Sequence, residues 1–365
     1  MKLVAESGLW TTGPQVAEPP SVAVLEVAGA VLEWTVTDAP DAPRITFTDV
    51  AAADWLWRLV GSDGHAQLAG VAENPAPDGA LVEIGDLRVA PEPLAALRRL
   101  AFGHWLRRWW PASRRDGIEE LDAALLDAEI AVLTADLQEY FSQNTFDSDI
   151  TGLLTPHRMA LAQTVRGGDP RTIDLIRAAA AVADDLGVGD WSEVLGKQGD
   201  SPTMRQDDYA LVAGRTADDV ADAIARGVST VCWTAVPPRI FDAGEDTVEW
   251  AVRGSGSAAV AEVRVATLGS AAGLPLRLDS DAITGRAVLA ADGSATVQLI
   301  DADGAPVTED RAWAHHWAGT RVSVGAPVTE PETVREDVRA LARRRLAAPG
   351  PDSFLAEILA AEADY

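Results

Sequence analysis

The sequence predicts an α+β protein of several domains, and two features of the chain lead to this fold class. Its 365 residues are enough for two or three domains of typical size, roughly 100–200 residues each. Its hydrophobic pattern also changes along the chain, from short β-rich runs to a helical period and back to β-rich runs. We therefore expect an N-terminal α/β domain at 1–112, a helical domain at 113–227 that is either separate or one unit with the first, an antiparallel Ig-like β-sandwich at 228–326, and a C-terminal helical tail at 327–365.

The N-terminal segment contains short runs of β-branched and aromatic residues. These runs predict strands at 22–27, 31–36 and 44–48. A helical run follows at 51–60, and a further strand-like run lies at 81–84. The mixture of the two patterns favours an α/β portion.

The middle of the chain shows the helical period most clearly. Apolar residues recur three and four positions apart from 93 to 110, where Pro111 ends the pattern, and a broad apolar stripe runs from 117 to 141. Further helices are expected at 172–186 and at 216–226. These segments together predict the helical middle.

Beyond residue 228 the helical period largely disappears. Roughly seven or eight short β-rich runs lie about 8–12 residues apart, a spacing typical of an antiparallel sandwich. Turn sequences such as Asp292-Gly293 and Asp303-Gly304 separate them.

The last segment of the chain follows a helix-breaking Pro-Gly-Pro run at 349–351. Its apolar side consists of four residues that are candidates for partner binding, namely Phe354, Leu355, Ile358 and Leu359. A segment this short is not a stable helix alone. We therefore expect it to dock in a groove, either on its own domain or on another chain.

The chain is strongly acidic. It has 56 acidic and 30 basic residues, which give a formal net charge of −26. Such a chain is repelled by phosphate backbones and by anionic membrane surfaces, so we expect neither nucleic acid nor membrane as a partner. The charge favours other proteins with basic surfaces, within an assembly or an oligomer.

Cysteine usage and hydropathy favour a cytoplasmic location. Cys232 is the only cysteine, so an intramolecular disulfide is excluded, and its apolar neighbours predict a small buried residue. The first ten residues lack an apolar core of signal-peptide length, and no run of ~18 apolar residues is present.

The motifs of common catalytic and cofactor sites are absent from the sequence. It contains no P-loop, no dinucleotide-binding glycine pattern, no H-E-x-x-H, no G-x-S-x-G and no C-x-x-C. The adjacent His315 and His316 would point to opposite faces of a strand, and Asp301 and Asp303 fit a hairpin turn better than a calcium loop. We therefore expect no catalytic residue, no cofactor and no metal.

A basic and aromatic island interrupts the acidic chain around residues 98–115. Four of its residues, Arg107, Arg108, Trp109 and Trp110, are candidates for binding a partner, because arginine and tryptophan dominate interface hot spots. The alternative is local, since the next helix is rich in carboxylates that could pair with these arginines. The local interpretation is favoured because sequence neighbours usually pack together.

Two short segments resemble a known group of proteins. They are 99–111, which reads RLAFGHWLRRWWP, and 236–243, which reads VPPRIFDA. Both are similar to segments of uncharacterised actinobacterial proteins encoded beside MoxR-type AAA+ ATPases and von Willebrand A-domain proteins, in conflict or stress systems. The resemblance covers about a tenth of the chain and implies an accessory role, without assigning any site residue.

The sequence thus favours a non-catalytic interaction or scaffold protein, an accessory component of a larger bacterial assembly. One alternative is a hydrolase or transferase with a site between the helical middle and the sandwich, for which His157 and Arg158 are the residues to inspect. The other is a ligand-binding sandwich, for example for carbohydrate. It requires the four tryptophans of that segment to be exposed on one face, Trp233, Trp250, Trp313 and Trp317.

Overall fold

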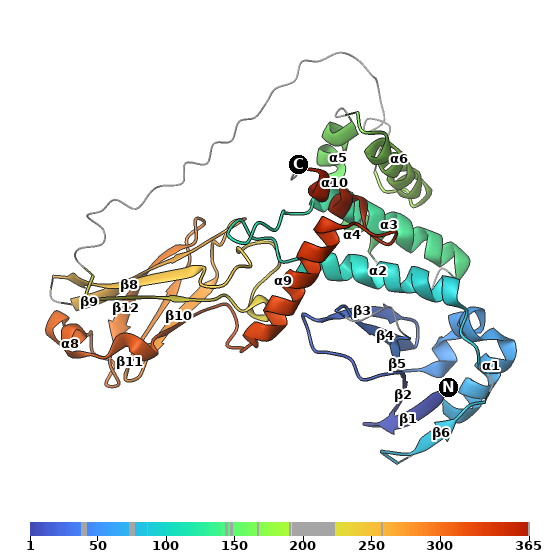
Figure 1. Cartoon of the computed structure of the whole chain (residues 1–365), viewed down its shortest axis with the longest axis horizontal. Helices are drawn as coiled ribbons and strands as arrows, with labels where there is room; N and C mark the ends of the chain where they lie inside the picture. Colours follow the sequence, from blue (N-terminus) through green and yellow to red (C-terminus); the bar gives the residue numbers. More distant parts are fainter. Residues whose placement is uncertain are drawn as a thin grey trace. The chain divides into compact units, whose positions relative to one another are not determined.

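The computed structural model describes residues 1–37, 42–72, 77–85, 87–142, 145–146, 149–165, 168–189, 191, 223–256 and 258–363. The chain contains helices and antiparallel sheets, and it divides into two compact units (Figure 1). The first unit comprises the described residues of 1–110, 120–198 and 336–365, and the second those of 111–119 and 199–335. Residues 216–222 of an expected helix lie outside the described residues, and the remainder of that prediction is wrong because Ala225 and Arg226 begin a strand.

The first unit contains a six-stranded antiparallel sheet. Its strands are β1 (Lys2–Glu6), β2 (Leu9–Thr12), β3 (Val22–Val27), β4 (Ala30–Thr35), β5 (Arg44–Phe47) and β6 (Leu81–Glu83). They follow the order β3-β4-β5-β2-β1-β6. Burial alternates along β4 and β5, as expected for strands with one face in a core.

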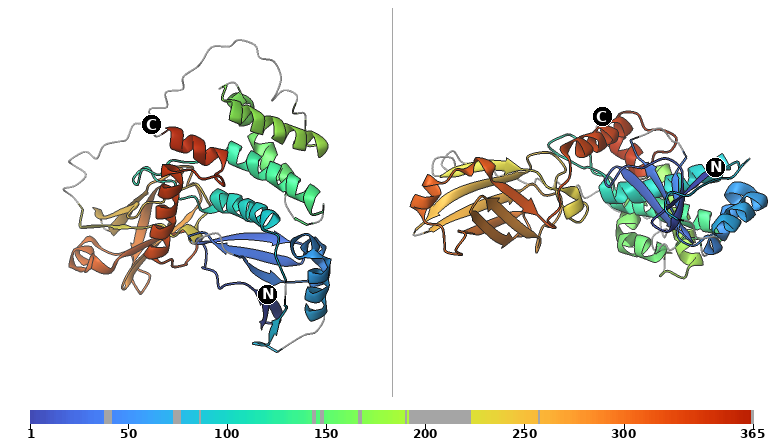
Figure 2. Two further views of the ribbon diagram at one scale, coloured as in Figure 1. Left: turned by 45° about the vertical axis from the view of Figure 1, so that its right-hand side comes forward. Right: turned by 90° about the horizontal axis from the view of Figure 1, so that it is seen from below.

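Helices cover this sheet and complete the unit. They are η1 (Val50–Ala52), η2 (Asp54–Leu56), α1 (Trp57–Ala72), α2 (Pro91–Trp109), α3 (Ala123–Tyr140), α4 (Ile150–Leu154), η3 (Thr155–His157), α5 (Arg158–Val165) and α6 (Pro170–Asp185). Helix α2 lies between the sheet, which it contacts at β3, and α3 (Figure 2). A separate helical middle is not confirmed, because α3 to α6 belong to the same unit as the sheet.

The second unit contains a seven-stranded antiparallel sheet. Its elements are β7 (Ala225–Ser229), η5 (Trp233–Ala235), β8 (Val248–Ser255), β9 (Ala258–Val265), β10 (Pro275–Ser280), β11 (Ile283–Val288), β12 (Ser294–Ile300), α8 (Glu309–Ala314), η6 (Trp317–Gly319) and β13 (Arg321–Val324). The strands follow the order β13-β10-β11-β12-β9-β8-β7.

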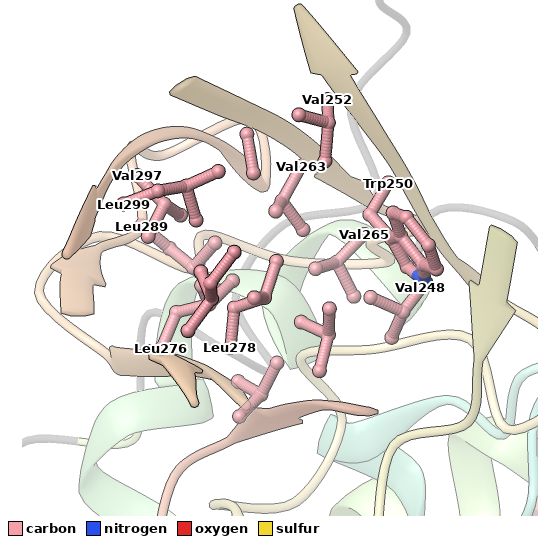
Figure 3. Close-up of a cluster of buried hydrophobic side chains, with 14 of the residues drawn as sticks. Val248, Trp250, Val252, Val263, Val265, Leu276, Leu278, Leu289, Val297 and Leu299 are labelled. Atoms are coloured by element: carbon pink, nitrogen blue, oxygen red, sulfur yellow. The ribbon is translucent and has the colours of Figure 1, made fainter. Parts of the chain in front are cut away.

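This second sheet rolls up until its two edges nearly meet. The backbone N–H of Val322 on β13 donates to the Ser229 hydroxyl on β7 over 3.3 Å. Valine and leucine side chains fill the interior together with Trp250 (Figure 3). The expected Ig-like sandwich is not confirmed, because the described strands form one nearly closed, barrel-like sheet and not two stacked ones.

Two helices end the chain, α9 (Glu332–Ala347) and α10 (Leu355–Ala363). From Glu336 onward they belong to the first unit, where α10 packs on α3. Among the described residues, none of the helices is long and apolar enough to cross a membrane.

Candidate functional site

The C-terminal segment docks on its own chain. The Phe354 side chain is fully buried, and its ring lies at Gly103 of α2 and Ile130 of α3. A Cβ atom added at Gly103 would come within 2.7 Å of the ring, so the glycine makes room for it. Of the two alternatives for this segment, the structure therefore shows docking in cis.

Buried ion pairs hold the docked segment. The Glu357 carboxylate is fully buried and accepts hydrogen bonds from Arg345 Nη2 and from the Phe354 backbone N–H, both over 2.8 Å. Glu129 of α3 accepts a hydrogen bond from the Leu355 N–H over 2.7 Å and pairs with Arg99. Burial raises the pKa of Glu129. Leu355, Ile358 and Leu359, the other three tail candidates, are half-buried.

The basic and aromatic island is largely paired within the chain. Arg107 Nε donates to Asp127 of α3 over 2.9 Å, and Arg99 pairs with Glu129, as the local interpretation predicts. The guanidinium of Arg108 stacks 3.9 Å above the Trp109 ring. Trp110 is buried. The island therefore stabilises the α2–α3 contact, and Arg107 is its most exposed candidate residue.

Asp127 is the centre of a polar cluster between helices. Its buried carboxylate accepts from Arg107 through Oδ1 and lies 2.9 Å from His157 Nε2 through Oδ2. His104, one turn before Arg107 on α2, is half-buried. Burial lowers the pKa of His104, and the charge of Arg107 lowers it further. Beside this cluster lies a hollow of about 480 Å³ lined by His104 and Arg107.

A second feature of the first unit is a stack of three side chains, the half-buried Arg58 with the exposed Trp57 and Tyr140, which we call the aromatic stack. The Arg58 guanidinium lies 4.5 Å from the Trp57 ring centroid and 5.1 Å from that of Tyr140. Trp57 is 47% exposed and Tyr140 44%. Arg58 forms no ion pair or hydrogen bond through its side chain with any residue that the structure describes.

The neighbours of these aromatic residues explain why they are held at the surface. Trp55 is buried and donates its indole N–H to the Ala28 carbonyl over 2.7 Å, which fixes the start of α1. Phe141 is buried against Trp55, with ring centroids 6.1 Å apart. Trp57 and Tyr140 therefore project outward from anchored chain segments. Sequence reasoning did not single out this stack, because nothing in the pattern tells an outward tryptophan from an inward one.

The second unit places its predicted residues mostly in structural roles. Trp233, Trp250 and Trp317 are buried, and Trp313 is 61% exposed, so the four do not form a common platform for a sugar. His315 is within 2.9 Å of the Ser280 hydroxyl, which is buried. His315 and its neighbour follow helix α8, so the expected strand at this point is wrong.

Other polar residues of the second unit serve turns and local pairs. Asp301 accepts hydrogen bonds from the N–H groups of Asp303 and Ala305, which is the hairpin turn expected from the sequence. Cys232 is half-buried and not fully buried as expected, and burial raises the pKa of its thiol. No three His, Cys, Asp or Glu side chains within the described residues gather closely enough to hold a metal.

A hollow of about 720 Å³ in the second unit is lined by residues of β7, β8, β9 and β12. Its charged side chains include Arg253 and Glu262, which pair with each other over 2.8 Å.

Comparison of the chain with protein-family models, curated proteins and solved structures gives no match.

Proposed function

We propose that this protein is a non-catalytic interaction protein of the cytoplasm, an accessory component of a larger assembly. The observation that carries this proposal is the aromatic stack. Tryptophan, tyrosine and arginine are the residue types most enriched among interface hot spots, and here the exposed rings of Trp57 and Tyr140 flank the half-buried Arg58 guanidinium.

The geometry of the stack suits a protein partner. Two aromatic rings hold the guanidinium in place, so little side-chain entropy is lost when a partner binds it. The planar fork can then donate to a carboxylate of the partner, while the rings cover its apolar side chains. The net charge of −26 favours approach of a partner that is basic overall.

The proposed location and accessory role have further support. A chain with one cysteine has no intramolecular disulfide, as is usual for proteins kept in a reducing compartment. The resemblance of 99–111 and 236–243 to accessory proteins of MoxR-type systems points to the same role. Both segments contain fold-forming residues, since Trp105 is buried and Asp242 is buried with hydrogen bonds from Ser113 and the Arg114 N–H.

Affinity purification from the native host tests this proposal. The baits are the full chain, the double variant Trp57→Ala/Tyr140→Ala, and Trp313→Ala as a matched control that removes an exposed tryptophan elsewhere. We expect the full chain and the control to recover the same specific protein, and the double variant to lose it. Equal recovery by all three baits, or recovery of no specific protein by the full chain, contradicts the proposal.

A second candidate function, that of a hydrolase or transferase, rests on the pair of His157 and Asp127. A buried carboxylate that holds a histidine ring in one orientation is an arrangement found in general-base catalysis, and these groups are 2.9 Å apart. A screen of chromogenic esters and phosphate esters with the full chain tests it. Turnover that His157→Gln abolishes would favour this function over the first.

A further inference from the structure

The hollow beside Asp127 has the size and the lining of a small-molecule site. Its volume of about 480 Å³ falls in the range of roughly 300–1,000 Å³ that is usual for ligand pockets. Its apolar walls are formed by β3, α2, α4 and the chain before α4, namely Val24, Leu25, Leu100, Phe146 and Leu153. Its polar lining consists of two basic and two acidic side chains, His104, Arg107, Glu26 and Asp149.

Asp127 holds the basic side chain of the hollow, Arg107, in place. Asp127 is buried and holds Arg107 by its Nε atom, and His157 occupies the other carboxylate oxygen. The Arg107 side chain is nevertheless 47% exposed. Its terminal nitrogens form no other hydrogen bond or ion pair with the part of the chain that the structure describes. They remain available to a ligand carboxylate, for which a guanidinium is the best-matched donor.

His104 adds a donor without adding a charge. It lies one turn before Arg107 on α2, so both side chains lie on the same side of the helix. Burial and the neighbouring cation lower the pKa of His104, so the imidazole is neutral at neutral pH and can donate one hydrogen bond.

The acidic side of the hollow can hold a cationic group. Glu26 is exposed on β3, and Asp149 lies at the N-terminus of α4, where its Oδ1 atom accepts the Gly152 N–H over 2.7 Å. The second oxygen of Asp149 and both oxygens of Glu26 can accept hydrogen bonds from an ammonium group. Basic and acidic side chains thus line one hollow beside apolar ones, so both charges of a ligand would have partners there.

We propose that this hollow binds a small zwitterion, an α-amino acid with an apolar side chain. The ligand carboxylate pairs with Arg107 and accepts from His104, the ammonium group lies between Glu26 and Asp149, and the apolar side chain packs on the leucine and phenylalanine walls. This site is separate from the aromatic stack. A failure of the proposed interaction function would therefore not contradict the proposed ligand site, and the reverse also holds.

Titration calorimetry of the full chain tests the proposal with three probes of matched shape. L-Leucine carries both charges, 4-methylpentanoate lacks the ammonium group, and isoamylamine lacks the carboxylate. We expect saturable binding of L-leucine at one site per chain, with both analogues at least about tenfold weaker, since each loses one charged contact. The absence of saturable L-leucine binding overturns the proposal. Equal affinity for all three probes overturns it as well.

Variants locate the binding in the hollow. Glu26→Gln should weaken L-leucine about tenfold and leave 4-methylpentanoate unchanged, because only the ammonium contact is lost. Glu83→Gln, which is exposed on β6 of the same sheet, is the matched control. Arg107→Lys keeps a charge beside the buried Asp127 and should weaken both L-leucine and 4-methylpentanoate, with unfolding measured to show that the fold is intact. Unchanged L-leucine affinity in Glu26→Gln and Arg107→Lys contradicts this location.

Discussion

At the scale of single residues, Phe354 decides whether the C-terminal segment stays docked. Its ring is fully buried between α2 and α3, and the Arg99 guanidinium lies 5.2 Å from its centroid. Replacing a buried phenylalanine by alanine typically costs about 3–5 kcal/mol, because the contacts are lost and a cavity remains. We therefore expect Phe354→Ala to lower the free energy of unfolding of the first unit by about that amount, as measured by chemical denaturation.

Leu81→Ala on β6 is the matched control for this substitution, because that side chain is 60% exposed. A surface change of this kind should stay within about 0.5 kcal/mol. A Phe354→Ala variant as stable as the control would show that the segment is not docked as the structure has it.

His104 makes the stability of the first unit depend on pH. Its pKa in the folded protein is lowered by burial first and by Arg107 second, so the unfolded chain takes up this proton at a higher pH than the folded one. The free energy of unfolding therefore falls as the pH drops through about 6.5, the ordinary histidine value, and the loss ends below the lowered pKa.

His104→Gln should remove this part of the pH dependence, as measured by denaturation between about pH 5 and 8. His65→Gln on α1 is the control and should retain the dependence of the unaltered protein. An unchanged slope in His104→Gln would assign the effect to other groups.

At the scale of elements, Gly103 in the middle of α2 is required by packing and not by helix propensity. Alanine is more favourable than glycine in a helix by about 1 kcal/mol. Here an added Cβ would lie 2.7 Å from Phe354 Cζ and 2.8 Å from Ile130 Cγ1. We expect Gly103→Ala to destabilise the first unit, since clashes of this kind cost about 1–3 kcal/mol.

Gly70→Ala provides the opposite case on α1. No atom lies within 4 Å of a Cβ at that position, and its backbone is not in the left-handed region. We expect this variant to be neutral or more stable when both glycine variants are compared by thermal denaturation. If Gly103→Ala raised the melting temperature as much as Gly70→Ala, the close packing of Phe354 at α2 would be contradicted.

Some of the strands and helices could be predicted from the sequence pattern, and others could not. The runs at 22–27 and 44–48 and the helical period at 93–110 correspond to β3, β5 and α2, because each buries one apolar face. The stripe at 117–141 predicts α3, but this helix begins only at Ala123, after its N-cap Asp122. The hairpin of β1 and β2 was not predicted, although its turn residues have positive φ values, 52° at Ser7 and 80° at Gly8. Serine and glycine at this turn were the available signal.

The candidate sites were harder to predict than the elements that carry them. Trp57 and Tyr140 belong to different helices, and tertiary packing such as that of Trp55 against Phe141 brings both rings to the Arg58 guanidinium. The hollow likewise combines β3, α2 and the start of α4. Such juxtapositions depend on tertiary contacts, which periodicity and spacing do not encode. The pairing of α2 arginines with α3 carboxylates was predictable because those helices are neighbours in the chain.

At the scale of the whole molecule, the structure describes two units with different interiors. In the first, helices cover an open sheet, and the docked tail is held by buried charges. The second contains a rolled sheet filled with valine, leucine and tryptophan. Among the features of both units, only the aromatic stack combines exposed rings with an arginine that has no ion pair among the described residues. The proposed interaction function therefore depends on this one surface.

The affinity of the purified chain for its recovered partner, compared with that of Arg58→Lys, tests this claim most directly. Lysine keeps the charge but loses the planar fork and its stacking on two rings. We predict that Arg58→Lys raises the Kd at least about tenfold, a loss of about 1.4 kcal/mol or more, while the free energy of unfolding is unchanged. An unaltered Kd would contradict the assignment of the aromatic stack as the binding surface.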